Sequence, residues 1–445
     1  MSGAALRVAM LPRGVDGLFL PPVEGVEVLA LVPRDSPEET WARALYPPER
    51  VLAYAWRRAD LGPYPATSDI LEHSDVPALL QESGTEALFL SASCTPRTLA
   101  WAQHHGVRLL MTDYEHQRRF EDKIAFDAFL GRHGIPKPAG GPVTLGRGAL
   151  PVRGPAVVQA PDSMGGEGTF FVRGAADVDD LTRRGVLRAG ERYLVRERIE
   201  GAPYGITIFV APGLVALSAL RLQCYYPDDG GVAPRLFAGV QWIPSSALTP
   251  LLRRRIDATF LGLGELLYRR RFFGFANVDF MIDRRARLFV IECNPRMSAA
   301  TPQLLRFPEL LSGVPAGAVF LRGFLGGRAY PRACERRPLP STSYRGATLD
   351  VVHAPEDHGH AGVVTREHWS GLYSLGAGDP AYAGPDVRQL VASGGLAALS
   401  FGRAGQTCRR GDTLATLVSS DALHDEHGAL LASARQVLRH FRYTG

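Results

Sequence analysis

Three side chains that can bind ions stand close together where a strand-like run ends. The segment FVIECNPR begins with apolar residues and ends with a carboxylate, an amide and a guanidinium: Glu292, Asn294 and Arg296. An earlier strand-like segment, FANVDFMI, carries Asn277 and Asp279. Carboxylate and amide oxygens suit Mg²⁺, which takes further ligands from water and phosphate, and a guanidinium suits phosphate. The two segments therefore predict a platform for a metal ion and a nucleotide.

The two segments are expected to pair as an antiparallel hairpin. With a two-residue turn at residues 285 and 286, equal offsets set Asp279 opposite Glu292 and Asn277 opposite Asn294. Like charges side by side destabilise a sheet unless a cation compensates them. Strict alternation also puts four residues of the second strand on one face: Leu288, Val290, Glu292 and Asn294. The residues alone leave open an exposed edge hairpin whose acids pair with nearby arginines, Arg284, Arg285 and Arg287.

The rest of the chain must position this hairpin. Up to about residue 115, short apolar runs alternate with helical stretches, which predicts a parallel sheet with crossover helices. A helix then leads to a strand, a Gly-rich loop and further strands, and a second helical period covers roughly residues 249 to 271. The expected fold is α/β followed by α+β. The expected parts are an N-terminal α/β domain at 1–115, a central domain at 116–330 with a mobile lid at about 145–200, and a β-rich α+β region at 331–445.

Composition limits the functional classes. The chain has 445 residues, 46% of them hydrophobic, and no apolar run near the roughly 18 residues of a membrane span, so a cytoplasmic protein without a membrane partner is expected. The five cysteines lie far apart without a CxxC pair, which argues against a disulfide framework and a zinc ribbon. The net charge of +5 carries no aromatic-interleaved basic motif, so nucleic acid is not an expected partner. A homodimer is the commonest assembly of such proteins.

Two further features of the sequence stand out. Lys123 is one of only two lysines among the 50 basic residues, although a solvated lysine at a helix start is the common alternative. The segment DSMGGEGTF can bring backbone N–H groups close to phosphate because glycine has no Cβ and permits positive φ. Its expected contacts are Ser163, Gly165, Gly166 and Gly168. A third group could bind a transition metal but is expected to be a flexible loop: His353, His358 and His360.

The order of five segments resembles the ATP-grasp family of ligases over about residues 110–310. These segments are EDKIAFDAFLGRHGIPKP, VVQAPDSMGGEGTFFV, YLVRERIEG, NVDFMID and VIECNPRMSAATPQL. The resemblance implies that two α+β subdomains hold ATP and that Mg²⁺, as two ions that Mn²⁺ can replace, links its phosphates to the hairpin. It also implies that a carboxylate becomes an acyl phosphate, which an amine then attacks.

The same resemblance assigns residues by position. Metal ligands are Asp279, Glu292 and Asn294, and catalytic contacts to phosphate or carboxylate are Arg296 and Arg221. ATP contacts are Lys123, Gln159, Ser163, Gly165, Gly166, Gly168, Glu197, Arg198 and Ile199. Three positions depart from the family pattern: Gln159 replaces a lysine, Arg196 an acid and Pro203 another acid.

The resemblance implies an ATP-dependent carboxylate–amine ligase that forms an amide or peptide bond and releases ADP and phosphate. Within the family, the segments VVQAP and NPRMSAATPQ are most similar to peptide ligases of specialised metabolism, such as that of the pheganomycin pathway. Its partners would be a small carboxylate and an amino acid or peptide. Two alternatives remain at this point. One is a carboxylase-type enzyme that activates bicarbonate, and the other is a nucleotide-binding regulatory protein without turnover.

Overall fold

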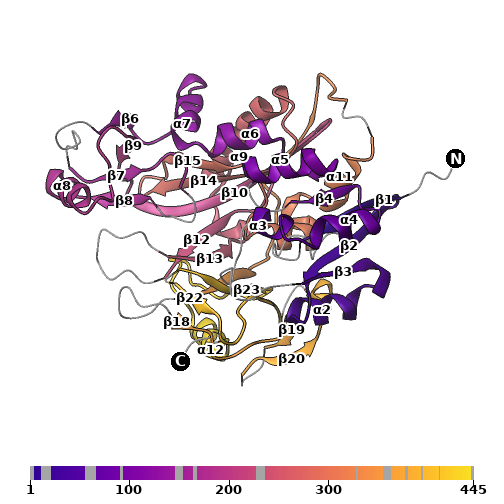
Figure 1. Ribbon diagram of the computed structural model, residues 1–445. Helices are drawn as coiled ribbons and strands as arrows, with labels where there is room; N and C mark the ends of the chain where they lie inside the picture. Colours follow the sequence, from indigo (N-terminus) through magenta and orange to yellow (C-terminus); the bar gives the residue numbers. More distant parts are fainter. Residues whose placement is uncertain are drawn as a thin grey trace.

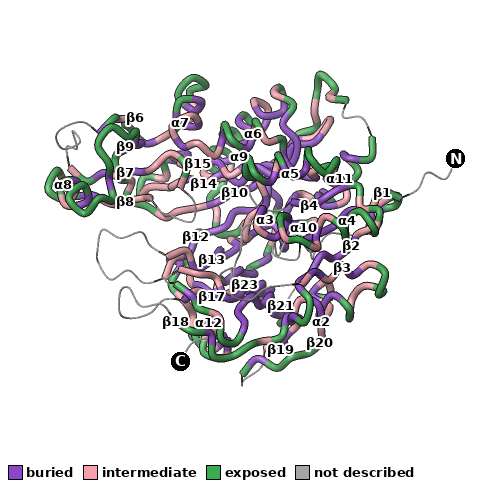
Figure 2. Tube along the Cα trace, viewed as in Figure 1, coloured by how far each residue is buried: buried purple, intermediate pink, exposed green. Residues whose placement is uncertain are grey.

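The computed structural model describes most of the chain. The described residues are 5–11, 22–55, 67–90, 94–145, 154–163, 168–226, 236–326, 329–353, 362–375, 379–391, 394–409 and 411–441. The described strands form four sheets, of five, four, twelve and two strands, and helices lie beside them (Figure 1). Buried residues follow the central strands, and exposed residues gather on the outer helices such as α8 (Figure 2).

The N-terminal part is a five-stranded sheet in the order β3-β2-β1-β4-β5, and all of its pairs are parallel. The strands are β1 Leu6–Met10, β2 Val26–Pro33, β3 Val51–Tyr54, β4 Ala87–Phe89 and β5 Arg108–Leu110. The connecting helices are α2 Pro37–Leu45, α3 Thr67–Leu71, α4 Val76–Glu82, α5 Pro96–His105 and α6 Tyr114–Glu121. The prediction of a parallel sheet with crossover helices is therefore confirmed.

A small four-stranded sheet lies at the opposite side of the molecule from β1 (Figure 1). Helix α7 Lys123–Arg132 leads into it, and its order is β6-β9-β7-β8. Its elements are β6 Gly140–Thr144, β7 Ala156–Gln159, β8 Thr169–Val172, α8 Ala175–Arg183 and β9 Arg192–Glu197. Helix α8 and the apolar residues of one sheet face form a separate small core. We call this unit the lid.

A twelve-stranded sheet joins the centre of the molecule to its C-terminal part. Its main path is β15-β14-β10-β12-β13-β17-β23-β21-β19-β20, and β11 and β16 branch from β10. The first strands are β10 Gly201–Ala211, β11 Leu214–Leu217, β12 Arg221–Tyr225, β13 Phe237–Trp242, β14 Gly274–Asp283 and β15 Leu288–Asn294. The later strands are β16 Glu335–Arg337, β17 Ala347–Val352, β19 Gly371–Ser374, β20 Ala381–Gly384, β21 Gly395–Ser400 and β23 Thr413–Ser419, while β18 Gly362–Val363 and β22 Thr407–Cys408 pair separately.

Four helices accompany this sheet. They are α9 Pro250–Arg269, α10 Thr301–Arg306, α11 Ala316–Arg322 and α12 Ala432–His440. Helix α9, which confirms the predicted helical period, packs its apolar face on β10 and β11. No helix among the described residues is long and apolar enough to cross a lipid bilayer.

The hairpin β14–β15 has the predicted register at its polar end and a different register at its turn. Asn277 pairs with Asn294, and Asp279 pairs with Glu292, as expected. The turn has three residues, not two, with Ala286 at φ +55°. Next to the turn, the register of the two strands is therefore shifted by one residue from the predicted register. A β-bulge at Ile291 shifts the register back by one residue, so that Asp279 and Glu292 pair as predicted.

Because of the bulge, the prediction that all four residues of the second strand share one face is wrong. Leu288 and Val290 pack in the core beside α9, whereas Glu292 and Asn294 line a cavity on the other side of the sheet. An extra residue between Val290 and Glu292 reverses the alternation there. The amide of Val290 donates to the carbonyl of Pro136 at 2.8 Å, which ties the bulge to the segment after α7.

Candidate active site

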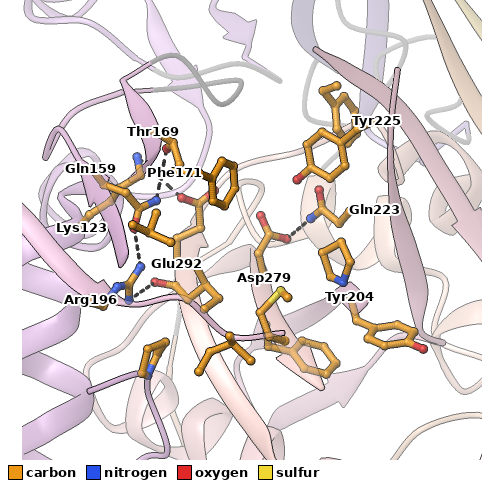
Figure 3. Close-up of a pocket in the computed structure, with 18 of the residues that line it drawn as sticks. Lys123, Gln159, Thr169, Phe171, Arg196, Tyr204, Gln223, Tyr225, Asp279 and Glu292 are labelled. Atoms are coloured by element: carbon orange, nitrogen blue, oxygen red, sulfur yellow. Dashed lines mark hydrogen bonds and ion pairs between the residues drawn. The ribbon is translucent and has the colours of Figure 1, made fainter. Parts of the chain in front are cut away.

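A large cavity separates the lid from the hairpin and the neighbouring strands (Figure 3). Its volume is about 850 Å³. Its walls come from the lid sheet, from the start of α7, from β12 and β13, and from the hairpin β14–β15 with the loop that follows. A cavity of this size fits a nucleotide together with a second small molecule. Eleven of the residues assigned from the resemblance line it: Lys123, Gln159, Ser163, Glu197, Arg198, Ile199, Arg221, Asp279, Glu292, Asn294 and Arg296.

The underside of the lid presents two rows of side chains to this cavity. Strand pairing aligns Phe171, Val157 and Arg196 in one row. Thr169 and Gln159 form the next row, closer to the Gly-rich loop. Cross-strand partners point to the same face of a sheet, and these five residues all line the cavity. The lid therefore offers an apolar patch followed by polar groups.

The two acids predicted to be adjacent lie side by side on the opposite wall. Asp279 and Glu292 face the cavity from paired positions of the hairpin. Burial first, and then the charge of Glu292, raise the pKa of Asp279 well above its usual range. The amide of Gln223 on β12 donates a hydrogen bond to Asp279. Asn294 lies beside Glu292, with its Nδ2 at 3.4 Å from Glu292 Oε1.

These residues fit a hard divalent cation. The like charges of Asp279 and Glu292 share one cavity wall. The amide oxygen of Asn294 adds a neutral ligand. Among the described residues no group of three or more His, Cys, Asp or Glu side chains could hold a metal ion. Mg²⁺ is commonly bound by one or two carboxylates and takes its other ligands from water and phosphate.

Arg221 is a buried countercharge, not a surface arginine. Its guanidinium donates to Thr207 Oγ1 at 2.9 Å and to Asn277 Oδ1 at 3.0 Å, and 2% of the residue is exposed. Burial lowers its pKa to about 10, against the raising effect of Asp279. A Cβ at Gly205 would lie 2.9 Å from Arg221 Nε, so the glycine leaves room for this side chain.

Arg296 and Lys123 supply positive charge on either side of Glu292. Arg296 donates to Glu121 Oε1 at 2.8 Å and to Asn294 Oδ1 at 3.1 Å. Lys123 is the first residue of α7, where the N-cap Asp122 fixes the helix start. Its ammonium donates to a backbone carbonyl in the Gly-rich segment and lies 3.6 Å from Glu292 Oε2. Lys123 is only 5% exposed, so the solvated-lysine alternative does not hold.

The remaining predicted contacts lie at the loop and the hinge. Gly168 has φ +72°, and a Cβ there would lie 2.9 Å from Ser163 Cβ, so the loop requires a glycine at this position. Gly165 and Gly166 lie outside the described residues, as do His358 and His360. At the hinge, the carboxylate of Glu197 accepts the backbone N–H of Ala139 at 3.0 Å.

Several cavity residues were not predicted as site residues. Arg196 was noted only as a departure from the family pattern, and Phe171, Tyr204, Gln223 and Tyr225 were not assigned at all. Two-residue alternation along β12 from Arg221 could have placed Gln223 and Tyr225 on the cavity face, whereas the other three lie on strands that carry no assigned cavity-facing residue at that spacing. Arg198 lies over the ring of Phe171, with its Cζ 5.3 Å from the ring centroid.

Comparison with known proteins places the chain in a fold class. No protein-family model matches the sequence. The architecture of a parallel N-terminal sheet, a lid and a large antiparallel sheet is that of ATP-grasp enzymes of the biotin carboxylase type.

Three solved structures illustrate the similarity. The biotin carboxylase domain of 2-oxoglutarate carboxylase from Hydrogenobacter thermophilus, solved with MgADP, ADP and bicarbonate, is 13% identical, with a TM-score of 0.61 over 94% of this chain and 86% of that one. Campylobacter jejuni biotin carboxylase with β-γ-ATP is 13% identical, with a TM-score of 0.60 over 93% and 87%. N5-carboxyaminoimidazole synthase from Aspergillus clavatus, with ADP and 5-aminoimidazole ribonucleotide, is 11% identical, with a TM-score of 0.54 over 93% of each chain. At these identities the similarity concerns the fold.

Proposed function

We propose that this protein is an ATP-dependent ligase that activates a carboxylate as an acyl phosphate and joins it to an amine. The observation that carries the proposal is the arrangement around Glu292. A paired acid, a neighbouring amide and the cations of Lys123 and Arg296 surround one cavity that an apolar lid patch covers. Phosphoryl transfer needs positioning and charge neutralisation more than acid–base chemistry by the protein.

Each side chain has a stated role in the proposal. Asp279, Glu292 and Asn294 would hold Mg²⁺, which would neutralise charge on the phosphates of a bound nucleotide. Lys123 binds phosphate from the lid side, and Arg296 binds the transferring phosphoryl group. The charge of Arg221 favours the ionised form of Asp279, against the opposing effects of burial and Glu292. An oxygen of the substrate carboxylate attacks the γ-phosphorus, and the bond to ADP breaks. The amine then attacks the carbonyl carbon, phosphate leaves, and the amine proton passes to solvent.

The amine substrate is proposed to be an amino acid or a short peptide. Beyond Asp279, the cavity continues along a wall with large apolar surfaces from Tyr204, Tyr225, Phe237 and Val240. The rings of Tyr225 and Phe237 meet edge to face, with centroids 6.1 Å apart. Such a wall suits an organic substrate with apolar parts better than a small ion. We extend the proposal to a peptide ligase of specialised metabolism acting as a homodimer, in line with the resemblance of VVQAP and NPRMSAATPQ.

A second candidate is the activation of bicarbonate by the same phosphoryl transfer. It is favoured by the biotin carboxylase fold, since one of the similar structures contains bicarbonate. Both candidates require the acid pair and Arg296, so mutation of these residues does not separate them. The identity of the molecule that stimulates ADP release does.

The test is ADP release by the purified protein with Mg²⁺ and ATP. Pools of amino acids and short peptides are compared with bicarbonate plus free biotin, and ADP and AMP are resolved. Stimulation by a peptide pool, abolished in Glu292→Gln and retained in the exposed control Glu426→Gln, is the expected result. Stimulation by bicarbonate plus biotin, without stimulation by any amino acid or peptide pool, would support the carboxylase candidate. ATP binding without turnover in any pool would favour a regulatory nucleotide-binding protein.

A further inference from the structure

Arg196 is an arginine enclosed in the lid wall at the hinge end of the cavity. It is the penultimate residue of β9, and its neighbour Val157 on β7 pairs with it directly. Figure 3 shows its guanidinium between Gln159 and the hairpin. Only 3% of the residue is exposed, yet it contributes to the lining of the cavity. Burial lowers the pKa of Arg196, against the raising effects of Asp127 and Glu292.

Two hydrogen bonds fix the orientation of this guanidinium. One terminal nitrogen donates to Gln159 Oε1 at 2.5 Å, and the other donates to the carbonyl of Ile291 at 3.0 Å. The second acceptor is the bulge residue of β15, so the irregularity in the hairpin provides it. The nearest carboxylate, that of Asp127, lies 3.7 Å away and already accepts from Lys137 at 2.6 Å. The bonds to described residues use two of the five N–H groups of an arginine.

Apolar residues adjoin Arg196 in the cavity wall, and we call this part of the cavity the slot. Val157 lines it from the lid, and Ile291 lines it from the hairpin. Both Val157 and Ile291 adjoin Arg196, one by strand pairing and the other by the hydrogen bond to its carbonyl. The Gly-rich loop and Lys123 lie one row further along the lid, beyond Gln159. A nucleotide with its phosphates at Lys123 would therefore have its base beside Arg196.

Two side-chain acceptors near the slot already accept hydrogen bonds from the protein. Gln159 presents its oxygen to Arg196, and its amide nitrogen lies 3.3 Å from Thr169 Oγ1. The carboxylate of Glu197, next along the strand, is turned to the backbone of Ala139. The fixed charge beside the base is thus the guanidinium. A guanidinium pairs with ring nitrogen and carbonyl acceptors on the imidazole side of a purine, where N7 is an acceptor in both adenine and guanine.

We propose that Arg196 is a nucleotide-binding residue that donates to N7 of a purine base, while Gln159 positions it. This assignment rests on the proposed function, since it requires that a nucleotide occupy the cavity. It also explains how the site can have a neutral Gln159 where the resemblance leads one to expect a lysine. In this protein the positive charge beside Gln159 is the guanidinium of Arg196 on the adjacent strand β9.

The test compares binding of Mg·ADP and Mg·7-deaza-ADP by titration calorimetry. Replacement of N7 by a carbon removes one acceptor and leaves the phosphates and the 6-amino group unchanged. Wild type is expected to bind the 7-deaza nucleotide at least tenfold more weakly. Arg196→Met, which keeps side-chain length without donors, should bind both nucleotides equally. Arg192→Met is the matched control, because Arg192 is an exposed arginine on the same strand, and it should behave as wild type.

The outcomes separate this assignment from the proposed function. Equal affinities of wild type for the two nucleotides would overturn the role of Arg196 and leave nucleotide binding intact. A purely structural arginine would weaken both nucleotides together in Arg196→Met and preserve the difference between them, which would also overturn the assignment. Failure of wild type to bind either nucleotide would overturn the proposed function, and the assignment with it. The comparison on wild type does not depend on the folding of any variant.

Discussion

Arg221→Met tests whether a buried arginine supports the acid pair. The substitution keeps an unbranched side chain but removes the positive charge behind Asp279. It also removes the donors to Thr207 and Asn277, at 2.9 and 3.0 Å. Because Arg221 is 2% exposed, water cannot replace these interactions. Asp279, a half-buried carboxylate beside Glu292, would then lack one of its two arginine countercharges.

The expected loss of stability is large. A hydrogen bond to a charged group contributes about 1.5–3 kcal/mol, so loss of the two bonds from Arg221 predicts a loss of about 3–6 kcal/mol for Arg221→Met in urea unfolding at pH 7 without Mg²⁺. The double variant Arg221→Met/Asp279→Asn should recover about 1–3 kcal/mol, because the uncompensated charge is gone. The exposed control Arg192→Met should change the free energy of unfolding by less than about 0.5 kcal/mol.

Two results would refute this reasoning. A loss below about 1 kcal/mol in Arg221→Met would mean that the arginine is not the countercharge of the site. Strict additivity of Arg221→Met and Asp279→Asn would mean that the two side chains do not interact, whatever the size of the single effects.

Three further predictions concern the acids, the lysine and a buried histidine. Asp279→Asn should raise the thermal midpoint of the metal-free protein by roughly 2–4 °C, since burial and Glu292 disfavour the charged form, and should abolish stabilisation by Mg²⁺. Lys123→Met should weaken Mg·ADP binding by roughly 10- to 100-fold, the value of a hydrogen bond to a charged group, as measured by calorimetry. Burial lowers the pKa of His424 from 6.5 to about 4. As the pH falls, this histidine is therefore protonated at a higher pH in the unfolded chain than in the folded protein. The free energy of unfolding should fall by about 3 kcal/mol as the pH drops from 6.5 towards 4. His424→Leu should remove that part of the acid sensitivity in urea titrations.

Two of these predictions have a matched control. Lys137→Met removes the only other lysine, which pairs with Asp127 outside the cavity, and should leave ADP affinity near that of wild type. His427→Leu removes an exposed histidine three residues from His424 and should preserve the acid sensitivity. Unchanged ADP affinity in Lys123→Met, an unchanged pH profile in His424→Leu, or a lower midpoint in Asp279→Asn would contradict the respective argument.

The polar end of the hairpin could be predicted because local pattern determines it. Alternation placed Asp279 and Glu292 side by side, and the structure has that pairing. The turn could not be predicted correctly, since a three-residue turn and a later bulge give the same final offset as a two-residue turn without one. Only contacts from elsewhere, such as the carbonyl of Pro136, reveal the bulge at Ile291.

The missed residues depend on pairing between distant strands. Arg196 reaches the cavity because β9 pairs with β7 across the lid, with about forty residues between them in sequence. Gln223 reaches Asp279 because β12 lies next to β10, which in turn pairs with β14. The continuation of the central sheet through β13 and β17 is another such pairing. One sequence carries the alternation within a strand but not the identity of its partner.

The most direct test of the central claim follows one oxygen atom. Once a stimulating carboxylate is found, it is supplied with ¹⁸O in its carboxyl group together with Mg·ATP and the amine, and the released phosphate is analysed by mass spectrometry. An acyl phosphate transfers one carboxylate oxygen to phosphate, so the account predicts ADP with phosphate that contains one ¹⁸O, and no such product from Glu292→Gln. Unlabelled phosphate, or AMP with pyrophosphate, would contradict it.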